Sequence, residues 1–326
     1  MHVTCLGRRS AVAFVAAIGS LCSPLLWAQS YPDRPITLIV SFEPGGSTDI
    51  SARAVAQELS VVLKQSVVVE NKTGAGGRIG TKAAALSKPD GYTLLWGSGS
   101  SLTAAPVLYA DQGHVATLVP VSVGATQPFV FVVPPSLGVK TTAEFVAMAK
   151  KNPGKMNFAS AGTGSSNHLL GEIFMSVTGA QLMHVPYRGA ALAKDALFKG
   201  DGQLMTEATS PLIGALRAGQ LQPLFITSDK RDAMFPDIPT AAEVGLPDLA
   251  IQGFFGLLAP AGTPPEIVDR LNRAMRQVLA SPAVTQAFAN LGFVAAYSTG
   301  AQMAERIAQG KARYAQIVAE RHIKVE

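Results

Sequence analysis

The sequence predicts an α/β protein built as two lobes, and two observations support this fold class. Short apolar runs of strand length alternate with longer stretches whose apolar residues recur at helical spacing. Near-continuous apolar strands separated by helices are typical of parallel sheets that carry helices on both faces. Removal of a predicted leader, residues 1–30, from the 326-residue chain leaves 296 residues, a length that favours two lobes over a single core.

The leader has the pattern of a secretory signal peptide. Arg8 and Arg9 form a charged start, an apolar stretch runs from 11 to 26, and Ala28-Gln29-Ser30 matches a small-x-small cleavage site. The apolar stretch is about 16 residues, shorter than the roughly 20 that cross a bilayer, so cleavage near Ser30 is favoured over a retained membrane anchor. The sequence therefore predicts export, with Tyr31 as the first mature residue.

Composition excludes several classes of function. Both cysteines, Cys5 and Cys22, lie in the leader, so the mature chain has no disulfide, thiol nucleophile or thiolate metal site. The leader holds two arginines and no acid, so the formal net charge falls from +5 to +3 after cleavage. The basic residues are scattered and not interleaved with aromatic ones, which argues against nucleic-acid binding.

The elements follow from residue 36 onward. A strand is predicted at 36–42, between Pro35 and a Pro-Gly-Gly turn, and helical spacing runs from 48 to 63. A strand at 67–69, a glycine-rich turn with a helix to about 86, and a strand at 92–96 come next. In the middle of the chain, the pattern predicts strands at 129–133, 156–159, 182–185, 203–205 and 223–227, and helices at 142–151, 165–177, 191–199 and 210–218.

The C-terminal part of the chain reads as helical. Amphipathic helices are predicted at 264–280, 282–291 and 301–323, with breaks at Gly292 and Gly300. We expect these helices to pack against the first lobe of the protein. The predicted organisation is a discontinuous first lobe, residues 31–125 and 228–326, around a second lobe at 126–227.

Glycine-rich loops recur where a strand gives way to a helix, at residues 44–49, 97–101 and 160–167. In open α/β sheets, ligands bind beyond the carboxyl ends of the strands, so these loops are expected to share one rim. A helix start has unpaired N–H groups that hold anions, and Ser, Thr and Asn side chains add further donors. The alternative is that all three are ordinary connections, in which glycine and serine are also common.

Catalytic and cofactor motifs are missing from the sequence. No complete G-x-G-x-x-G, P-loop, G-x-S-x-G or H-E-x-x-H motif occurs, and the histidines are too dispersed for a metal signature. His168 either lines the cleft or caps a helix. Asp49 either complements the helix dipole, contacts a ligand or orients its own loop. An exported chain with an anion-binding loop and no catalytic motif favours solute capture over chemistry, without a cofactor or metal.

A series of motifs spans the mature chain in a specific order and spacing. They are YPDRPI at 31–36, FEPGGSTD at 42–49, VENKTGAGG at 69–77, PDGYTL at 89–94, NFASAGTG at 157–164, HVPYRG at 184–189, DIPT at 237–240 and GLLAPAG at 256–262. Together they resemble the Bug-type substrate-binding receptors of tripartite tricarboxylate transporters. No single motif is decisive, but the set is highly specific.

The resemblance implies a periplasmic receptor with a type II-like periplasmic binding protein fold, in which a hinge and a ligand cleft lie between two α/β lobes. Such a receptor captures a small carboxylate and delivers it to the large and small permease subunits in the membrane. We expect it to act as a monomer and to have no catalytic residue. The expected ligand-binding residues, carried over where the motifs match and joined by Ser98 and Glu207, are Gly45, Gly46, Ser47, Thr48, Asp49 and Ser98 from the first lobe and Ser160, Gly162, Thr163, Gly164, Ser165, His168, Tyr187 and Glu207 from the second.

Two segments depart from the family pattern. The family commonly carries two aspartates in a stretch like V-D-x-M-F-D-N, where this chain has Gln203, Glu207 and Ala208, and residues 109–120 lack the usual acidic and aromatic residues. A carboxylate at Glu207 repels a ligand carboxylate unless it meets a hydroxyl or an amine, so we expect altered specificity. Two alternatives stay open: a periplasmic ligand-sensing partner of a signalling system, and a secreted enzyme on the same scaffold, which the missing motifs disfavour.

Overall fold

The structure is a computed structural model that describes residues 1–2, 31–109 and 113–320. Most of the predicted leader, at residues 3–30, lies outside the described residues. The same holds for 110–112, within the segment that departs from the family pattern, and for 321–326, at the end of the last predicted helix.

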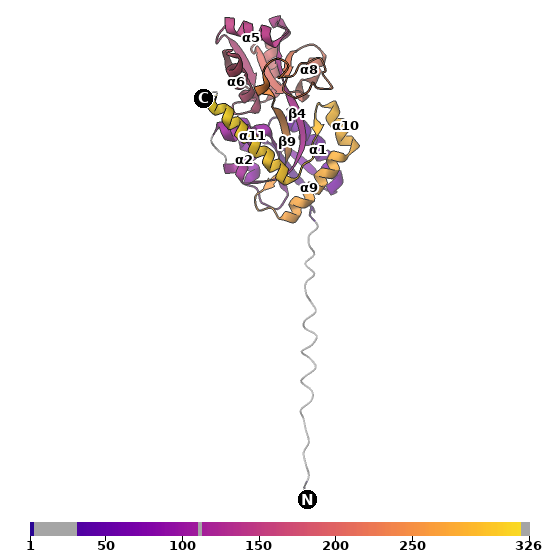
Figure 1. Cartoon of the computed structure of the whole chain (residues 1–326). Coiled ribbons are helices and arrows are strands. Elements are labelled where there is room, and N and C mark those ends of the chain that lie inside the picture. Colours follow the sequence, from indigo (N-terminus) through magenta and orange to yellow (C-terminus); the bar gives the residue numbers. More distant parts are fainter. Residues whose placement is uncertain (3–30, 110–112, 321–326) are drawn as a thin grey trace.

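One ten-stranded sheet runs through the molecule in the order β2-β1-β3-β9-β4-β7-β5-β6, and β10 and β8 also pair with β4. The sheet changes partners along β4 (Leu118–Val133). Residues 118–128 of β4 pair antiparallel with β9 (Gln252–Pro260), whereas the residues from 129 onward pair antiparallel with β7 (Leu204–Ala208) and β8 (Gln222–Ile226). Because β4 belongs to both halves of the sheet, it joins the lower and upper parts of the molecule (Figure 1).

The first half of the sheet has helices on both faces. It contains β1 (Ile36–Val40), β2 (Val67–Asn71), β3 (Thr93–Ser98), β9 and β10 (Val294–Ala295). Leu38 and Val40 pack with α1 (Ser47–Leu63), α9 (Pro265–Ala280) and α10 (Pro282–Asn290). Ile39 points to the opposite face and packs with α2 (Arg78–Ala85) and α11 (Gly300–Glu320). This alternation follows from the two-residue period of a strand.

The second half repeats the arrangement with β5 (Met156–Ser160), β6 (Leu182–Pro186), β7 and β8. Phe131 and Val133 pack with α5 (Thr142–Lys151) and α6 (Ser166–Thr178) on one face. Val130 and Val132 pack with α7 (Ala190–Lys199) and α8 (Ile213–Arg217) on the other. Each half therefore has its own buried core.

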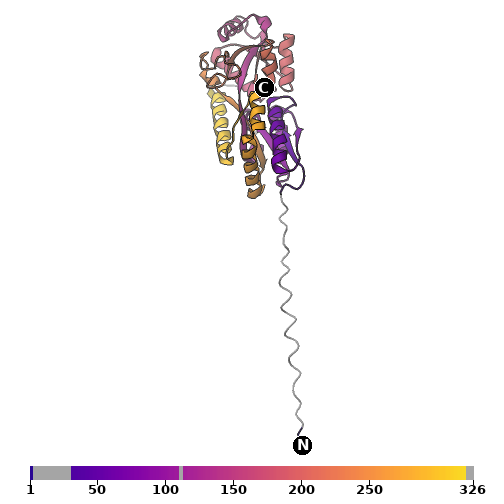
Figure 2. The same ribbon diagram turned by 90° about the vertical axis from the view of Figure 1, so that its right-hand side faces the viewer.

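Helix α11 connects the two halves. Met303 and Ile307 in its first part belong to the apolar cluster of the first half, whereas Tyr314 belongs to that of the second. Figures 1 and 2 show α11 lying along the side of the molecule. The remaining helical segments are short: η1 (Ala75–Gly77), η2 (Ser100–Ala104), α3 (Ala105–Leu108), α4 (Gly113–Ala116), η3 (Pro135–Leu137), η4 (Ser210–Leu212) and η5 (Pro247–Leu249). Among the described residues, no helix is long and apolar enough to cross a membrane.

The two-lobed α/β fold is confirmed, but the expectation of purely parallel sheets is wrong at the centre. Strands β1, β2 and β3 are parallel to one another, as are β5, β6 and β7, whereas β9 and β4 pair antiparallel with their neighbours. The sequence reading missed β9 and recognised only the last five residues of β4. The predicted helix at 210–218 is split into η4 and α8. The lobe boundaries given above stay a prediction.

Candidate ligand-binding site

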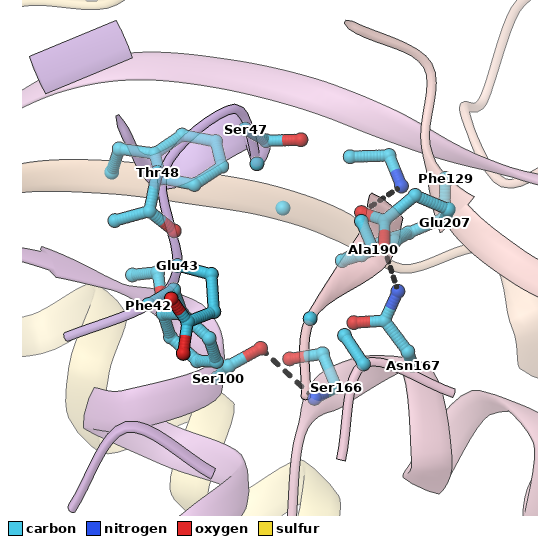
Figure 3. A pocket seen from close by; sticks show the side chains of 18 of the residues that line it. Phe42, Glu43, Ser47, Thr48, Ser100, Phe129, Ser166, Asn167, Ala190 and Glu207 are labelled. Atoms are coloured by element: carbon cyan, nitrogen blue, oxygen red, sulfur yellow. Dashed lines mark hydrogen bonds between the residues drawn. The ribbon is translucent and has the colours of Figure 1, made fainter. Parts of the chain in front are cut away.

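A pocket lies where the two halves of the sheet meet, and we call it the interlobe pocket. The first half contributes the loop after β1, the start of α1, the end of β3 and part of β9. The second half contributes the loop after β5 and the starts of α6 and α7. The lining residues are Phe42, Glu43, Gly46, Ser47, Thr48, Ser98, Gly99, Ser100, Phe129, Ala161, Ser166, Asn167, Gly189, Ala190, Glu207, Ala208, Gly253, Phe254 and Phe255 (Figure 3).

The start of α1 offers free hydrogen-bond donors to this pocket. Its N-cap is Gly46, which has no side chain to accept from the first N–H groups of the helix. Ser47 and Thr48 line the pocket and are buried, and the Ser47 hydroxyl has no hydrogen-bond partner among the described residues. In Figure 3 this hydroxyl points across the pocket toward the side of Glu207. Free N–H groups and the positive end of the helix dipole suit an anion.

The start of α7 is a second uncapped helix end at the pocket. Its N-cap, Gly189, has φ of 100° and provides no side-chain cap, and Gly189 and Ala190 both line the pocket. A φ in this range is readily adopted only by glycine. Donors from both halves of the molecule therefore face one cavity.

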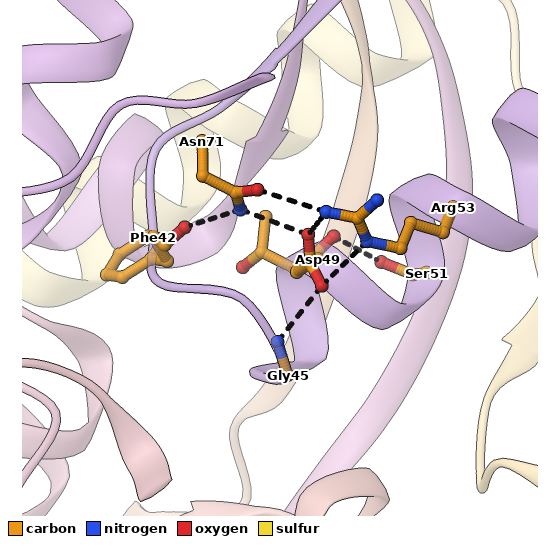
Figure 4. Close-up of polar contacts among 7 residues, drawn as sticks. Phe42, Gly45, Asp49, Ser51, Arg53 and Asn71 are labelled. Carbon is orange, nitrogen blue, oxygen red and sulfur yellow. Dashed lines mark hydrogen bonds and ion pairs between the residues drawn. The ribbon is translucent and has the colours of Figure 1, made fainter. Parts of the chain in front are cut away.

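Asp49 points away from the interlobe pocket and holds the loop that forms it. One carboxylate oxygen accepts hydrogen bonds from Gly45 N and Arg53 Nε, both at 3.0 Å. The other lies 3.0 Å from Asn71 Nδ2 and 2.9 Å from an Arg53 guanidinium nitrogen (Figure 4). Burial alone raises the pKa of Asp49, but the hydrogen bonds from Arg53, Gly45 and Asn71 outweigh it, so the pKa lies below its usual value. We call this set of contacts the Asp49 network.

The loop after β5 is held by hydrogen bonds among its own side chains. Ser160 Oγ lies 2.7 Å from His184 Nε2 and accepts from Gly162 N at 3.2 Å. Ser165 is the N-cap of α6: its hydroxyl donates to Gly162 O at 2.7 Å and accepts from His168 N at 3.2 Å. These side chains shape the loop, while the pocket is lined by its neighbours Ala161, Ser166 and Asn167.

His168 is buried beneath the same loop. Its Nδ1 accepts from Gly164 N at 3.3 Å, and its Nε2 lies 3.4 Å from Glu172 Oε1. Its ring stacks on that of His184, with centroids 4.0 Å apart. Burial, with a smaller effect of His168, lowers the pKa of His184 to about 3, so His184 is neutral at physiological pH.

Glu207, at the end of β7, is the buried acid of the interlobe pocket, with 5% of its surface exposed. One carboxylate oxygen accepts from Asn167 Nδ2 at 2.9 Å and the other from its neighbour's amide, Ala208 N, at 2.8 Å (Figure 3). Burial raises the pKa of Glu207 to about 7, and these two hydrogen bonds only partly offset the effect.

A second cavity adjoins the interlobe pocket and shares Phe42, Glu43, Ala161 and Gly189 with it. We call this second cavity the outer hollow. It is lined by residues of η1 and by the segments around 161–163 and 186–189, which include Gly162, Thr163, Tyr187 and Arg188.

Several contacts between the halves close the cleft over the interlobe pocket. Ser166 N donates to Ser100 Oγ at 2.9 Å, and the Tyr109 hydroxyl donates to Thr163 O at 3.1 Å. Gly76 packs so closely on Gly164 that a Cβ atom on Gly76 would lie 2.8 Å from the Gly164 carbonyl carbon. The described structure is therefore a closed arrangement of the two lobes.

The predicted site residues fall into three groups. Those that line the interlobe pocket are Gly46, Ser47, Thr48, Ser98 and Glu207, and those that line the outer hollow are Gly162, Thr163 and Tyr187. Gly45, Asp49, Ser160, Gly164, Ser165 and His168 make contacts within or next to the two loops. The residues that sequence reasoning missed include Phe42, Glu43, Ser100, Phe129, Asn167, Ala190 and Phe254. Phe42 and Glu43 lie in the FEPGGSTD motif, and Ser100 and Asn167 lie in the glycine-rich loops named above. Phe129 and Phe254 look like core residues in the sequence.

Within residues 31–109 and 113–320, no cluster of His, Cys, Asp and Glu side chains could hold a metal ion.

Comparison with known proteins shows which family this chain resembles. Residues 51–323 match the family model of the tripartite tricarboxylate transporter family receptor. The chain is 39% identical to protein BugT of Bordetella pertussis over 316 residues, 96% of each chain. It superposes on the periplasmic binding protein BugD with a TM-score of 0.86 at 30% identity, covering 91% of this chain and 100% of that one. R. palustris Rpa4515 with adipate gives a TM-score of 0.86 at 31% identity, covering 90% and 99%.

The fold, with its closed pocket between two α/β lobes, defines the chain as a periplasmic solute-binding receptor. It belongs to the receptors of the tripartite tricarboxylate transporter family, and the Bug-type resemblance of its motifs is confirmed. This family consists of receptors and not of enzymes.

Proposed function

We propose that the protein captures a small carboxylate between its two lobes and delivers it to the membrane permease subunits of a tripartite tricarboxylate transporter. The observation that carries this proposal is the uncapped start of α1 inside the interlobe pocket, with a buried Ser47 hydroxyl that lacks a partner among the described residues. Charge-assisted hydrogen bonds from such donors are stronger than neutral ones, so a few of them suffice for micromolar affinity, which needs about 8 kcal/mol.

We assign two kinds of role to the residues of the site. Gly46, Ser47, Thr48 and Ser98 contact the ligand from one lobe, and Glu207 contacts it from the other. The Asp49 network and the hydrogen bonds of Ser160, Ser165 and His168 hold the two loops in place. Ligand that contacts both lobes stabilises the closed arrangement, because those contacts exist together only when the cleft is closed.

The remaining parts of the proposal concern location and organisation. The chain is exported to the periplasm with cleavage near Ser30, and it acts as a monomer. Its lobes comprise residues 31–125 with 228–326, and 126–227, with the hinge where β4 changes partners. It binds its ligand without converting it.

Thermal unfolding against a panel of mono-, di- and tricarboxylates tests capture. A ligand at about 100 times its dissociation constant adds about 2.7 kcal/mol to the free energy of unfolding, which raises the melting temperature measurably. Ser47→Ala removes a donor to the charged group and should weaken binding by about tenfold or more. Ser87→Ala is the matched control, because the Ser87 hydroxyl donates to Ala83 O at the end of α2 and Ser87 does not line the pocket in the described structure. A folded protein that no carboxylate stabilises would overturn the proposal.

Delivery needs a separate test. Uptake of the identified carboxylate into vesicles that carry the large and small permease subunits should depend on added receptor. Uptake that is independent of the receptor would restrict the proposal to ligand capture.

A further inference from the structure

We propose that the ligand of the interlobe pocket carries an ammonium group as well as its carboxylate, and that Glu207 binds this ammonium group. The inference rests on the proposed function, since it names the class of carboxylate that the receptor takes. Its starting point is the charge of the pocket. Among the described residues, the charged ones that line it are Glu43 and Glu207, and none of the lining residues is Lys, Arg or His. A ligand with negative charge alone would face two acids without a cation.

Glu207 has the environment of an acceptor that lacks its counter-charge. It is buried, and no ion pair joins it to any residue in the described part of the chain. Its oxygens accept from Asn167 Nδ2 and Ala208 N, which use two of the about four lone-pair positions of a carboxylate. A buried acid without a cation is costly, and an ammonium group would supply both the missing charge and further donors.

Besides its two acids, the pocket presents hydrogen-bond donors at the starts of α1 and α7. The α1 side presents the Ser47 hydroxyl and the first N–H groups of an uncapped helix, which suit a carboxylate. Figure 3 shows Glu207 and Asn167 on the side opposite Ser47 and Thr48. A ligand with a carboxylate at one end and an ammonium group nearby matches this arrangement.

Arginines near the site lie outside the interlobe pocket. Arg306 and Arg313 of α11 line a hollow behind it, which shares the wall formed by Gly99, Phe129, Ser166, Gly253 and Phe254. Arg306 lies over the Phe254 ring, 5.4 Å from its centroid. Within the described part of the chain, neither arginine forms an ion pair with Glu43 or Glu207.

Matched ligand pairs test the inference. Calorimetric titration of the protein compares glutarate with glutamate, succinate with aspartate, and propionate with alanine. In each pair that the protein binds, we expect the amino acid to bind at least about tenfold more tightly than the plain carboxylate. This is the effect of one charge-assisted hydrogen bond. Glu207→Gln should reduce that ratio to below threefold, whereas Glu207→Asp, which keeps the charge, should retain a preference. Ser47→Ala should weaken both members alike.

The outcomes separate this inference from the proposed function. Pairs in which the amino group gives no advantage, or in which the plain carboxylate binds more tightly, overturn the inference and leave a carboxylate receptor. Retention of the full amino preference in a folded Glu207→Gln variant also overturns it. If neither these ligands nor any other carboxylate binds to the folded protein, the proposed function itself fails. The wild-type comparison decides the question even where a variant does not fold.

Discussion

At the scale of the single residue, Glu207 is a buried acid whose environment differs from that of an ordinary exposed acid. Its side chain is 5% exposed, and its partners are an amide side chain and a backbone N–H group. Burial therefore raises the pKa of Glu207 to about 7. A group with this pKa couples the stability of the protein to pH, which can be measured without any ligand.

Glu207→Gln should change how stability depends on pH. The folded state of the wild type holds the Glu207 proton more tightly than the unfolded chain does, where the pKa is 4.5. Glu207 therefore does not lower the free energy of unfolding below about pH 4.5. As the pH rises through about 7, the free energy of unfolding falls by on the order of 3 kcal/mol. Denaturant unfolding at pH 4 and pH 8 should show the wild type losing this stability relative to the variant.

The comparison with Glu207→Gln cancels other titrating groups. His184 acts in the opposite direction, because its pKa of about 3 in the folded state means that stability falls as the pH drops below the unfolded value of 6.5. Both proteins contain His184, so its effect is common to them. Equal pH slopes in the two proteins would contradict the account of Glu207.

The residues of the site differ in how far sequence could predict them. Gly46, Ser47 and Thr48 have a local signal, because a strand followed by Pro-Gly-Gly-Ser-Thr marks a helix start. Glu207 is predicted as a ligand-binding residue only from its place in the segment that departs from the family pattern. Its partner Asn167 lies 40 residues away in sequence and reaches it through the packing of α6 on β7. Contacts of this kind depend on the tertiary structure and leave no local pattern.

At the scale of the element, the loop between β1 and α1 depends on the Asp49 network. A carboxylate at the first turn of a helix commonly complements the helix dipole. Here it also fixes the backbone, because it accepts from Gly45 N and is itself held by Arg53 and Asn71 (Figure 4). The loop thereby keeps the start of α1 at the pocket.

Asp49→Asn should weaken both stability and ligand binding. The substitution keeps the shape but loses the charge and at least one accepted hydrogen bond, which lowers the free energy of unfolding by about 2 kcal/mol. The looser loop should weaken carboxylate binding about tenfold, as measured by titration. Glu58→Gln is the control, since it removes an acid from the middle of the same helix. A variant with wild-type affinity would show that the Asp49 network does not position the site.

The strands differ in how well their sequence patterns predict them. Strands β1, β3, β5 and β8 are short and apolar between turn residues, and they were predicted. The first part of β4 contains Pro120 and Pro128, which argue against a strand, and the pairing with β9 shifts register near Pro120 and again near Gly124. Gly253 and Gly256 likewise make the strand pattern of β9 harder to recognise in the sequence. Both strands are stabilised by pairing with each other.

At the scale of the whole molecule, closure depends on a close approach of the two lobes at Gly76. Its φ is 62°, and an added Cβ would lie 2.8 Å from the Gly164 carbonyl carbon and 2.9 Å from Thr163 O. These are backbone atoms that cannot turn aside as the end of a flexible side chain could. A side chain at residue 76 is therefore incompatible with the closed arrangement.

Gly76→Ala should favour the open arrangement. We expect ligand affinity to fall by about tenfold or more, because the population that can bind is reduced. Small-angle scattering should show a smaller decrease in radius of gyration on ligand addition than in the wild type. Gly138→Ala controls for backbone strain, since Gly138 has a similar φ of 70° and open space around its Cβ position. Equal effects of the two substitutions would mean that strain, and not contact between the lobes, explains the loss.

The central claim is that the start of α1 in the interlobe pocket binds a ligand carboxylate, and a crystal structure of the complex tests it most directly. We predict a carboxylate oxygen within roughly 2.7–3.2 Å of the N–H groups of Ser47 or Thr48 and of the Ser47 hydroxyl. A carboxylate bound instead beside Arg306 and Arg313 behind the pocket, or only beside Arg188 in the outer hollow, would contradict the claim.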